Sequence, residues 1–153
     1  MIPVLGIDPG AKGGFAWRNI DGQHFVSKMP DTPGDVCEAL REIYVSNPHM
    51  VAIMEKVGGY TGGAGAPGSA MFNFGHGVGF MEGVIMALGI PLELCTPQKW
   101  QKHFQLGTRG DLSKTEWKNK AKAEAQRRYP EIKVTLDVSD ALLIMAYKVE
   151  RMR

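Results

Sequence analysis

The chain has 153 residues, of which 44% are hydrophobic and 22% charged, and its formal net charge is +2. This is the size of one domain with a core large enough to fold unaided, so we expect a single domain over residues 1–153. No apolar run approaches the roughly 20 residues that a membrane span needs, and the start of the sequence lacks a secretion signal. We therefore expect a cytoplasmic protein that contacts no membrane.

The chain opens with an apolar stretch that ends in a carboxylate. Residues 4–7 favour a strand, Asp8 follows at once, and Pro9-Gly10 is a turn signal. A carboxylate at the end of a buried strand costs free energy unless it is paired or binds a metal. Asp8 therefore either caps a turn or belongs to a site, and its position alone does not decide between them.

The next segments predict an antiparallel meander. Residues 13–17 and 23–27 read as two further strands, and Asp21-Gly22 between them is a hairpin signal. Residues 35–46 carry apolar side chains at three- and four-residue spacing, which predicts a helix with one buried face, capped by Asp35.

A second apolar run, residues 50–54, ends at Glu55 just as the first strand ends at Asp8. A strand reached through a crossover helix usually runs parallel to an earlier strand. If it lies beside the first strand, both carboxylates project from the same end of the sheet. Sheets of this class place their ligands at that end.

Residues 58–68 form a glycine-rich segment without the GK[ST] ending of a nucleotide-binding P-loop. A helix is predicted from Ser69 to about Leu88, and Gly75, Gly79 and Gly83 recur in it every four residues. Because each glycine weakens a helix by roughly 1 kcal/mol relative to alanine, the stripe indicates that something packs very closely. We expect the sheet to be that neighbour, with a symmetric second subunit as the alternative.

The rest of the chain predicts one more strand and three helices. Residues 90–94 read as an edge strand because Pro91 cannot donate to a ladder. Thr96-Pro97 opens a helix, Ser113 caps a basic helix that ends near residue 129, and residues 137–149 form the last helix.

The charge is unevenly distributed. Residues 99–128 hold nine basic and three acidic side chains, a local net charge of +6, which leaves −4 for the remainder. Such a basic face is typical of a protein that binds a polyanion, although a solvated helix surface would give the same pattern.

Two aspartates, Asp137 and Asp140, stand three residues apart at the start of the last helix and therefore face one direction. Capping would explain the first but not the second. If they converge with Asp8 and Glu55, the four carboxylates make an all-oxygen site suited to Mg²⁺ or Mn²⁺ and not to zinc. The four histidines are scattered and none is assigned to a metal.

Three motifs resemble those of the RuvC family of Holliday junction resolvases, within the ribonuclease H-like superfamily. They are Gly6-Ile7-Asp8-Pro9-Gly10, Met54-Glu55-Lys56 and Asp137-Val138-Ser139-Asp140-Ala141-Leu142-Leu143. The order and spacing of these motifs match those of the family over nearly the whole chain. The compact length, the segment 97–100 and Arg127-Arg128-Tyr129-Pro130 look most like the phage and poxvirus members.

The resemblance implies an α/β, ribonuclease H-like fold with a five-stranded mixed sheet flanked by helices, a homodimer, and Mg²⁺-dependent symmetric nicking of four-way DNA junctions. It assigns the catalytic and metal-binding roles to Asp8, Glu55, Asp137 and Asp140, with two Mg²⁺ ions per active site or Mn²⁺ in their place. It also implies a bacterial or phage-infected cell as the location, or a viral factory for a poxvirus-like member.

The family inserts side chains into the junction centre from the segment after the fourth strand, which here is longer and richer in glycine than in bacterial members. The aromatic residues open for this role are Tyr60, Phe72 and Phe74. The lysines of the basic helix that we expect to contact DNA phosphates are Lys114, Lys118 and Lys122.

The residues and the resemblance agree on a hydrolysis in which two Mg²⁺ ions activate a water and stabilise the attacking and leaving oxygens. Three alternatives stay open. One is a nuclease that trims branched, flap or RNA-containing substrates in general, and another is a junction-binding protein without catalysis. The third is an actin-like nucleotide-binding protein, which we rank last because the chain is too short for a second lobe.

Overall fold

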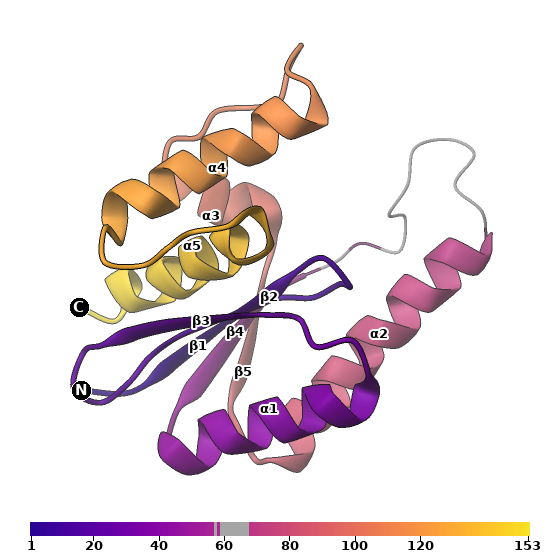
Figure 1. Ribbon diagram of the computed structural model, residues 1–153, viewed down its shortest axis with the longest axis vertical. Coiled ribbons are helices and arrows are strands. Elements are labelled where there is room, and N and C mark those ends of the chain that lie inside the picture. Colours follow the sequence, from indigo (N-terminus) through magenta and orange to yellow (C-terminus); the bar gives the residue numbers. More distant parts are fainter. Residues whose placement is uncertain (57, 59–67) are drawn as a thin grey trace.

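The computed structural model describes residues 1–56, 58 and 68–153 (Figure 1). Its five strands form one mixed sheet in the order β3-β2-β1-β4-β5. β1 (Val4–Asp8), β2 (Gly14–Arg18) and β3 (His24–Lys28) make the predicted antiparallel meander, and β4 (Val51–Glu55) and β5 (Leu92–Cys95) extend the sheet in parallel. The expected five-stranded mixed sheet, with its proline-flanked strand at one edge, is confirmed.

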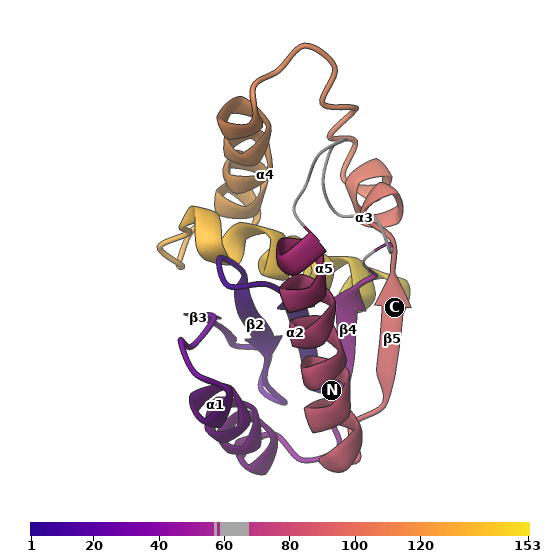
Figure 2. The ribbon, with the colours of Figure 1, turned by 90° about the vertical axis from the view of Figure 1, so that its right-hand side faces the viewer.

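Helices cover both faces of the sheet (Figures 1 and 2). α1 (Pro33–Ser46) and α2 (Gly68–Ala87) lie on one face. α3 (Pro97–His103), α4 (Lys114–Arg128) and α5 (Leu136–Arg151) lie on the other. Within the described ranges, no helix is long and apolar enough to cross a membrane.

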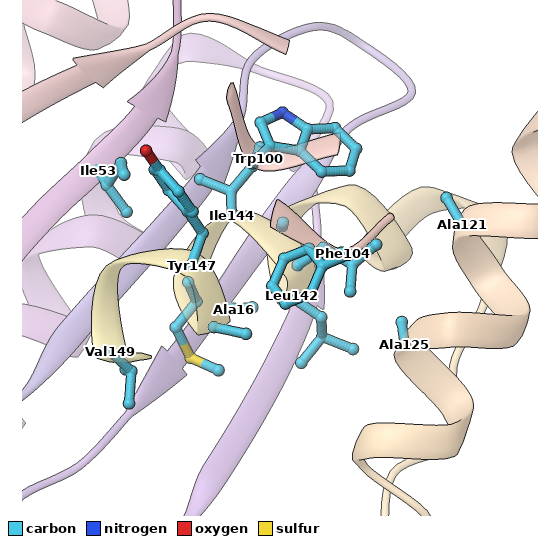
Figure 3. Packing of buried hydrophobic residues seen from close by; sticks show 14 of the residues in the cluster. Ala16, Ile53, Trp100, Phe104, Ala121, Ala125, Leu142, Ile144, Tyr147 and Val149 are labelled. Atoms are coloured by element: carbon cyan, nitrogen blue, oxygen red, sulfur yellow. The ribbon is translucent and has the colours of Figure 1, made fainter. Parts of the chain in front are cut away.

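The core consists of two hydrophobic clusters, one on each face of the sheet. Because successive strand residues point to opposite faces, Val4 of β1 belongs to the α5 cluster and Leu5 to the α1–α2 cluster. Figure 3 shows Leu142 of α5 within its cluster, and Ala125 on the side of α4 that faces it. The buried residues of α4 in this cluster are Ala121 and Ala125, whose small side chains line its contact with α5.

Threonines stand at the N-cap positions of α1 and α5, and of these two only the side chain of Thr32 makes a capping hydrogen bond. Thr32 is the N-cap of α1, and its Oγ1 accepts a hydrogen bond of 3.1 Å from the backbone N of Asp35. The prediction of Asp35 as the cap is therefore wrong, because Pro33 fits the first helical position and moves the start upstream. Likewise Thr135 precedes α5, which leaves Asp137 inside the first turn.

The glycine stripe of α2 does not pack against the sheet. A Cβ placed on Gly75, Gly79 or Gly83 would meet no atom within 4 Å. The expected packing of these glycines on the sheet is therefore wrong. α2 turns Met81 and Ile85 inward instead, and its glycine stripe faces outward.

Candidate active site

Two carboxylates end adjacent parallel strands at the same end of the sheet. Ile7 of β1 pairs in register with Met54 of β4. Asp8 and Glu55 are the residues that follow, and each is the last residue of its strand. The predicted juxtaposition of Asp8 and Glu55 follows directly from this register.

Gly6 allows α5 to bring a third carboxylate to this end of the sheet. A Cβ on Gly6 would overlap the carbonyl oxygen of Ala141 and would lie 2.6 Å from the backbone N of Met145. Since no real Cβ tolerates such distances, only glycine lets α5 lie directly on β1. The first turns of α5, which carry Asp140, are thereby held beside the end of β1.

Two glycines, Gly13 before β2 and Gly14 at its start, fix the backbone around the carboxylates. A Cβ on Gly13 would overlap the carbonyl oxygen of Asp8 and lie 3.1 Å from its Cγ. A Cβ on Gly14, which pairs with Asp8 in register, would lie 3.0 Å from the carbonyl oxygen of Asp137. The start of α5 is therefore packed against the strand pair that presents Asp8.

Burial raises the pKa values of three carboxyl groups, and repulsion from neighbouring carboxylates adds to the shift at Asp8 and Glu55. Burial, then the charges of Asp140 and Glu55, raise the pKa of Asp8 to about 8. Burial raises the pKa of Glu55 to about 7, and Asp140 adds to the shift. Burial also raises the pKa of Asp140 to about 6. The structure thus brings Asp8, Glu55 and Asp140 together in a site that is short of positive charge.

Lys118 of α4 supplies the one positive charge that lowers the pKa of both Asp8 and Asp140. The sequence indicated Lys118 only as a DNA contact. Its neighbours at four-residue spacing, Lys114 and Lys122, lie on the same side of the helix. This lysine face of α4 therefore borders the carboxylates.

Trp100 of α3 holds the side chain of Glu55. Its indole Nε1 donates a hydrogen bond of 2.9 Å to Oε2 of Glu55, which opposes the rise in the pKa of that carboxyl group. The indole is almost fully buried in the core cluster. The sequence places Trp100 on a helix, but it gives no sign that the N–H reaches a residue 45 positions away.

Asp137 is half-buried, and its carboxylate is engaged in no hydrogen bond or ion pair with the part of the chain that the structure describes. It shares a helix face with Asp140 at three-residue spacing. Its role as a fourth ligand stays a prediction.

The donor chemistry suits a hard divalent cation. Within residues 1–56, 58 and 68–153, no three Asp, Glu, His or Cys side chains are grouped closely enough to hold an ion by themselves. Mg²⁺ usually keeps several waters and takes one or two carboxylates plus substrate phosphate oxygens, so it does not need such a cage. Buried oxygen donors whose charges repel one another fit Mg²⁺ or Mn²⁺.

The aromatic residues expected near DNA differ in their surroundings. Tyr60 lies outside the described residues. Phe72 is 72% exposed and stacks on His76 with 6.0 Å between ring centroids. Phe74 is half-buried beside Gly10, where a Cβ would lie 3.5 Å from its ring. Of the two described residues, Phe72 is the more exposed.

No protein-family model matches this sequence, and no curated protein does. The fold is similar to that of Thermus thermophilus RuvC in complex with a Holliday junction substrate, at 16% identity and a TM-score of 0.65, over 98% of this chain and 96% of that one. A second structure of T. thermophilus RuvC gives 14% identity and a TM-score of 0.65, over 99% and 97% of the two chains.

Fowlpox virus resolvase, in complex with Holliday junction DNA, is 15% identical over 97% of this chain and 99% of that chain. Its TM-score of 0.47 is too low to carry an argument. The likeness to RuvC shows that the chain has a RuvC-like, ribonuclease H-like fold over nearly its full length.

Proposed function

We propose that the chain is a structure-selective DNA endonuclease that resolves four-way junctions by paired nicks. The observation that carries this proposal is the convergence of Asp8, Glu55 and Asp140 at one end of a RuvC-like sheet, with the pKa of each raised by burial. Raised pKa values of this kind cluster at functional sites. The similar structures include a RuvC in complex with a Holliday junction substrate.

Divalent metal ions complete this proposal. Asp8, Glu55 and Asp140, with Asp137 as the fourth ligand, would hold two Mg²⁺ or Mn²⁺ ions. Bound ions of this type supply Lewis acidity, which lowers the pKa of a water and stabilises charge on the phosphate oxygens. The contribution of the chain itself is to orient Glu55 through Trp100 and to hold the half-buried carboxylates together at one end of the sheet.

The lysine face of α4 is the proposed DNA surface. Lys114, Lys118 and Lys122 lie along one side of the helix, and the charge of Lys118 acts on the carboxylates. A duplex arm held by this face would lead its backbone into the site. Contacts of this type position the duplex without reading its sequence, and they make affinity fall steeply with salt.

We also propose that two copies associate through the outward face of α2. Gly75, Gly79 and Gly83 form an open stripe there, and Met86 on the same side is 77% exposed. The helix holds one charged residue, Glu82. Because exposed apolar surface is unfavourable in water, a second copy that packs on the stripe would cover it, with Glu82 on the same face as the contact. Two active sites in such a dimer would account for paired nicks.

Cleavage of a labelled four-way junction, next to a linear duplex and a flap, in Mg²⁺ and in EDTA, tests the proposal. We expect symmetric, metal-dependent nicks on the junction alone. Equal cutting of flaps would make the protein a general branch nuclease, and junction binding without cutting would leave a binding protein.

The variant Asp8→Asn should abolish cleavage and keep or strengthen junction binding, because a charge that repels the phosphates is removed. The matched control is Asp21→Asn, in the exposed hairpin turn between β2 and β3. It should cleave like the wild type. Cleavage retained in Asp8→Asn would contradict the assignment of the site.

A further inference from the structure

A second polar site lies at the opposite end of the sheet from the carboxylates. A cavity of about 340 Å³ is lined there by the C-terminal ends of α4 and α5, by Met1 and by the β2–β3 hairpin. In the β1–β2 register, Arg18 pairs with Val4 and Gly14 pairs with Asp8. Val4 and Asp8 are four residues apart along β1, so the two sites lie roughly 13 Å apart along the strand. Figure 1 shows both chain ends at this end of the sheet.

Arg18 lines this cavity, and one nitrogen of its guanidinium group has no hydrogen-bond partner in the part of the chain that the structure describes. Its Nη2 donates a hydrogen bond of 2.8 Å to the carbonyl oxygen of Ile2, which fixes the guanidinium group. Its Nε is buried and has no hydrogen-bond partner, and within the described ranges it is the one buried side-chain nitrogen or oxygen in that state. Buried donors are nearly always satisfied in folded proteins, and this N–H has no acceptor among the described residues.

The charges around the cavity favour an anionic acceptor. Arg128 is already paired, because its guanidinium nitrogens lie 2.6 Å from a carboxylate oxygen of Glu124 and 2.5 Å from Oε1 of Glu150. The other oxygen of Glu150, Oε2, lies 2.7 Å from Nε2 of His103. Arg18 and Arg153, which also line the cavity, form no ion pair with any described residue. Burial and then the charge of Arg153 lower the pKa of Arg18, so the two cations repel each other across the space.

The remaining walls are suited to a compact ligand. Tyr129 and His24 pack edge to face with ring centroids 4.8 Å apart, and both line the cavity. Burial lowers the pKa of His24, which favours its neutral form. The net positive charge therefore comes from the arginines, whose planar forks match the oxygens of a phosphate group.

We propose that this cavity is a binding site for a phosphate-class oxyanion, with Arg18 as its central ligand and Arg153 as a second cation. An anion held by the two guanidinium groups would offset the repulsion between them. Two sources share this chemistry: a backbone phosphate of a nucleic-acid arm that extends away from the carboxylates, and a free phosphate or phosphomonoester.

Titration calorimetry with inorganic phosphate, on the full chain in EDTA at constant ionic strength, tests the proposal. The wild type should bind phosphate saturably, and Arg18→Gln should weaken this binding about tenfold or more, as expected for a lost charge-assisted hydrogen bond. The control Arg41→Gln, on α1 and paired only with Glu38 at 2.7 Å, should bind like the wild type.

Arg153→Gln keeps the test valid if Arg18→Gln does not fold, because Arg153 is exposed. It should weaken phosphate binding by a smaller factor. The site would be refuted if the wild type showed no saturable binding, or if both variants bound phosphate as the wild type does. The titration uses neither DNA nor cleavage, so its failure would not bear on the nuclease proposal.

Junction binding in EDTA identifies the source of the anion. If a backbone phosphate occupies the cavity, Arg18→Gln lowers the affinity for junction DNA and free phosphate competes with the DNA at constant ionic strength. If the ligand is a free phosphate or phosphomonoester, wild type and Arg18→Gln bind the junction equally and differ only in the calorimetric titration. Either result supports the site.

Discussion

The indole Nε1 of Trp100 donates a hydrogen bond of 2.9 Å to Oε2 of Glu55, and so links α3 to the end of β4. This bond stabilises the ionised form of Glu55 against the burial that raises its pKa to about 7. Partners of this kind orient metal-binding carboxylates and keep them ready to bind.

Replacement of Trp100 by Phe should therefore lower cleavage about 10- to 100-fold, the range seen when a supporting partner of a metal ligand is lost. Without the hydrogen bond, the pKa of Glu55 should rise further, so the acid limb of the pH–rate profile should move to higher pH. Steady-state cleavage between pH 6 and 9 at several Mg²⁺ concentrations measures both effects.

The control for this variant is Phe104→Leu, which removes volume from the same core cluster without touching Glu55. It should lose stability in urea while the acid limb stays in place. If Trp100→Phe and Phe104→Leu changed cleavage alike, the effect would come from packing and the hydrogen bond would have no role.

Gly6 leaves no space for a larger side chain between β1 and α5. A Cβ there would overlap the backbone of Ala141 and lie 2.6 Å from the backbone N of Met145, and backbone cannot rotate away. Gly6→Ala should cost about 3 kcal/mol or more of the free energy of unfolding, at the upper end of overpacking effects. Urea denaturation followed by circular dichroism measures this loss.

Gly34→Ala is the matched control, since a Cβ at Gly34 in the first turn of α1 meets nothing within 4 Å. It should be neutral or stabilise by up to about 1 kcal/mol through helix propensity. Equal effects at the two glycines would show that α5 does not rest on β1 as closely as described.

The two strand-end carboxylates were predictable because each follows a short apolar run, and parallel pairing then brings them together. The hydrogen bond from Trp100 was not, because its partner is remote in sequence and only the docking of α3 selects it. The effect of Lys118 on Asp8 was not predictable either. Its spacing from Lys114 and Lys122 predicts a shared helix face, but it does not indicate which residues lie opposite that face.

The direction of the α2 glycine stripe also could not be read from the sequence. α2 is apolar around its whole circumference, so no polar side identifies which residues face solvent. The buried positions Met81 and Ile85 could equally have faced outward by pattern alone. The packing of α2 on the sheet decides the matter, and it leaves the glycines outside.

The raised pKa of Asp8 predicts how stability depends on pH in EDTA. The folded carboxyl group, with a pKa of about 8 against an ordinary 3.8, binds its proton more tightly than the unfolded one. The folded state therefore holds more protons, and stability falls as pH rises from about 4 through 8. Glu55 and Asp140, also with raised pKa values, act in the same direction.

Asp8→Asn removes the largest of these contributions. At pH 8 the metal-free variant should be more stable than the wild type by on the order of 3 kcal/mol, since each pKa unit corresponds to about 1.4 kcal/mol and the three sites are coupled. At pH 5 the difference should shrink. Urea unfolding at both pH values, with Asp21→Asn as the control, measures it, and a pH-independent difference would contradict the pKa argument.

Gly79→Ala separates a free α2 from one that packs against a second copy. In the isolated chain the new Cβ meets nothing within 4 Å, so helix propensity alone should stabilise the protein by up to about 1 kcal/mol. In a dimer that packs closely on the stripe, the same methyl group holds the helices apart and should raise the dimer dissociation constant, which sedimentation equilibrium measures. Gly34→Ala, away from α2, should leave that constant unchanged. A variant that gained stability and kept the wild-type association state would place the subunit contact elsewhere on the molecule.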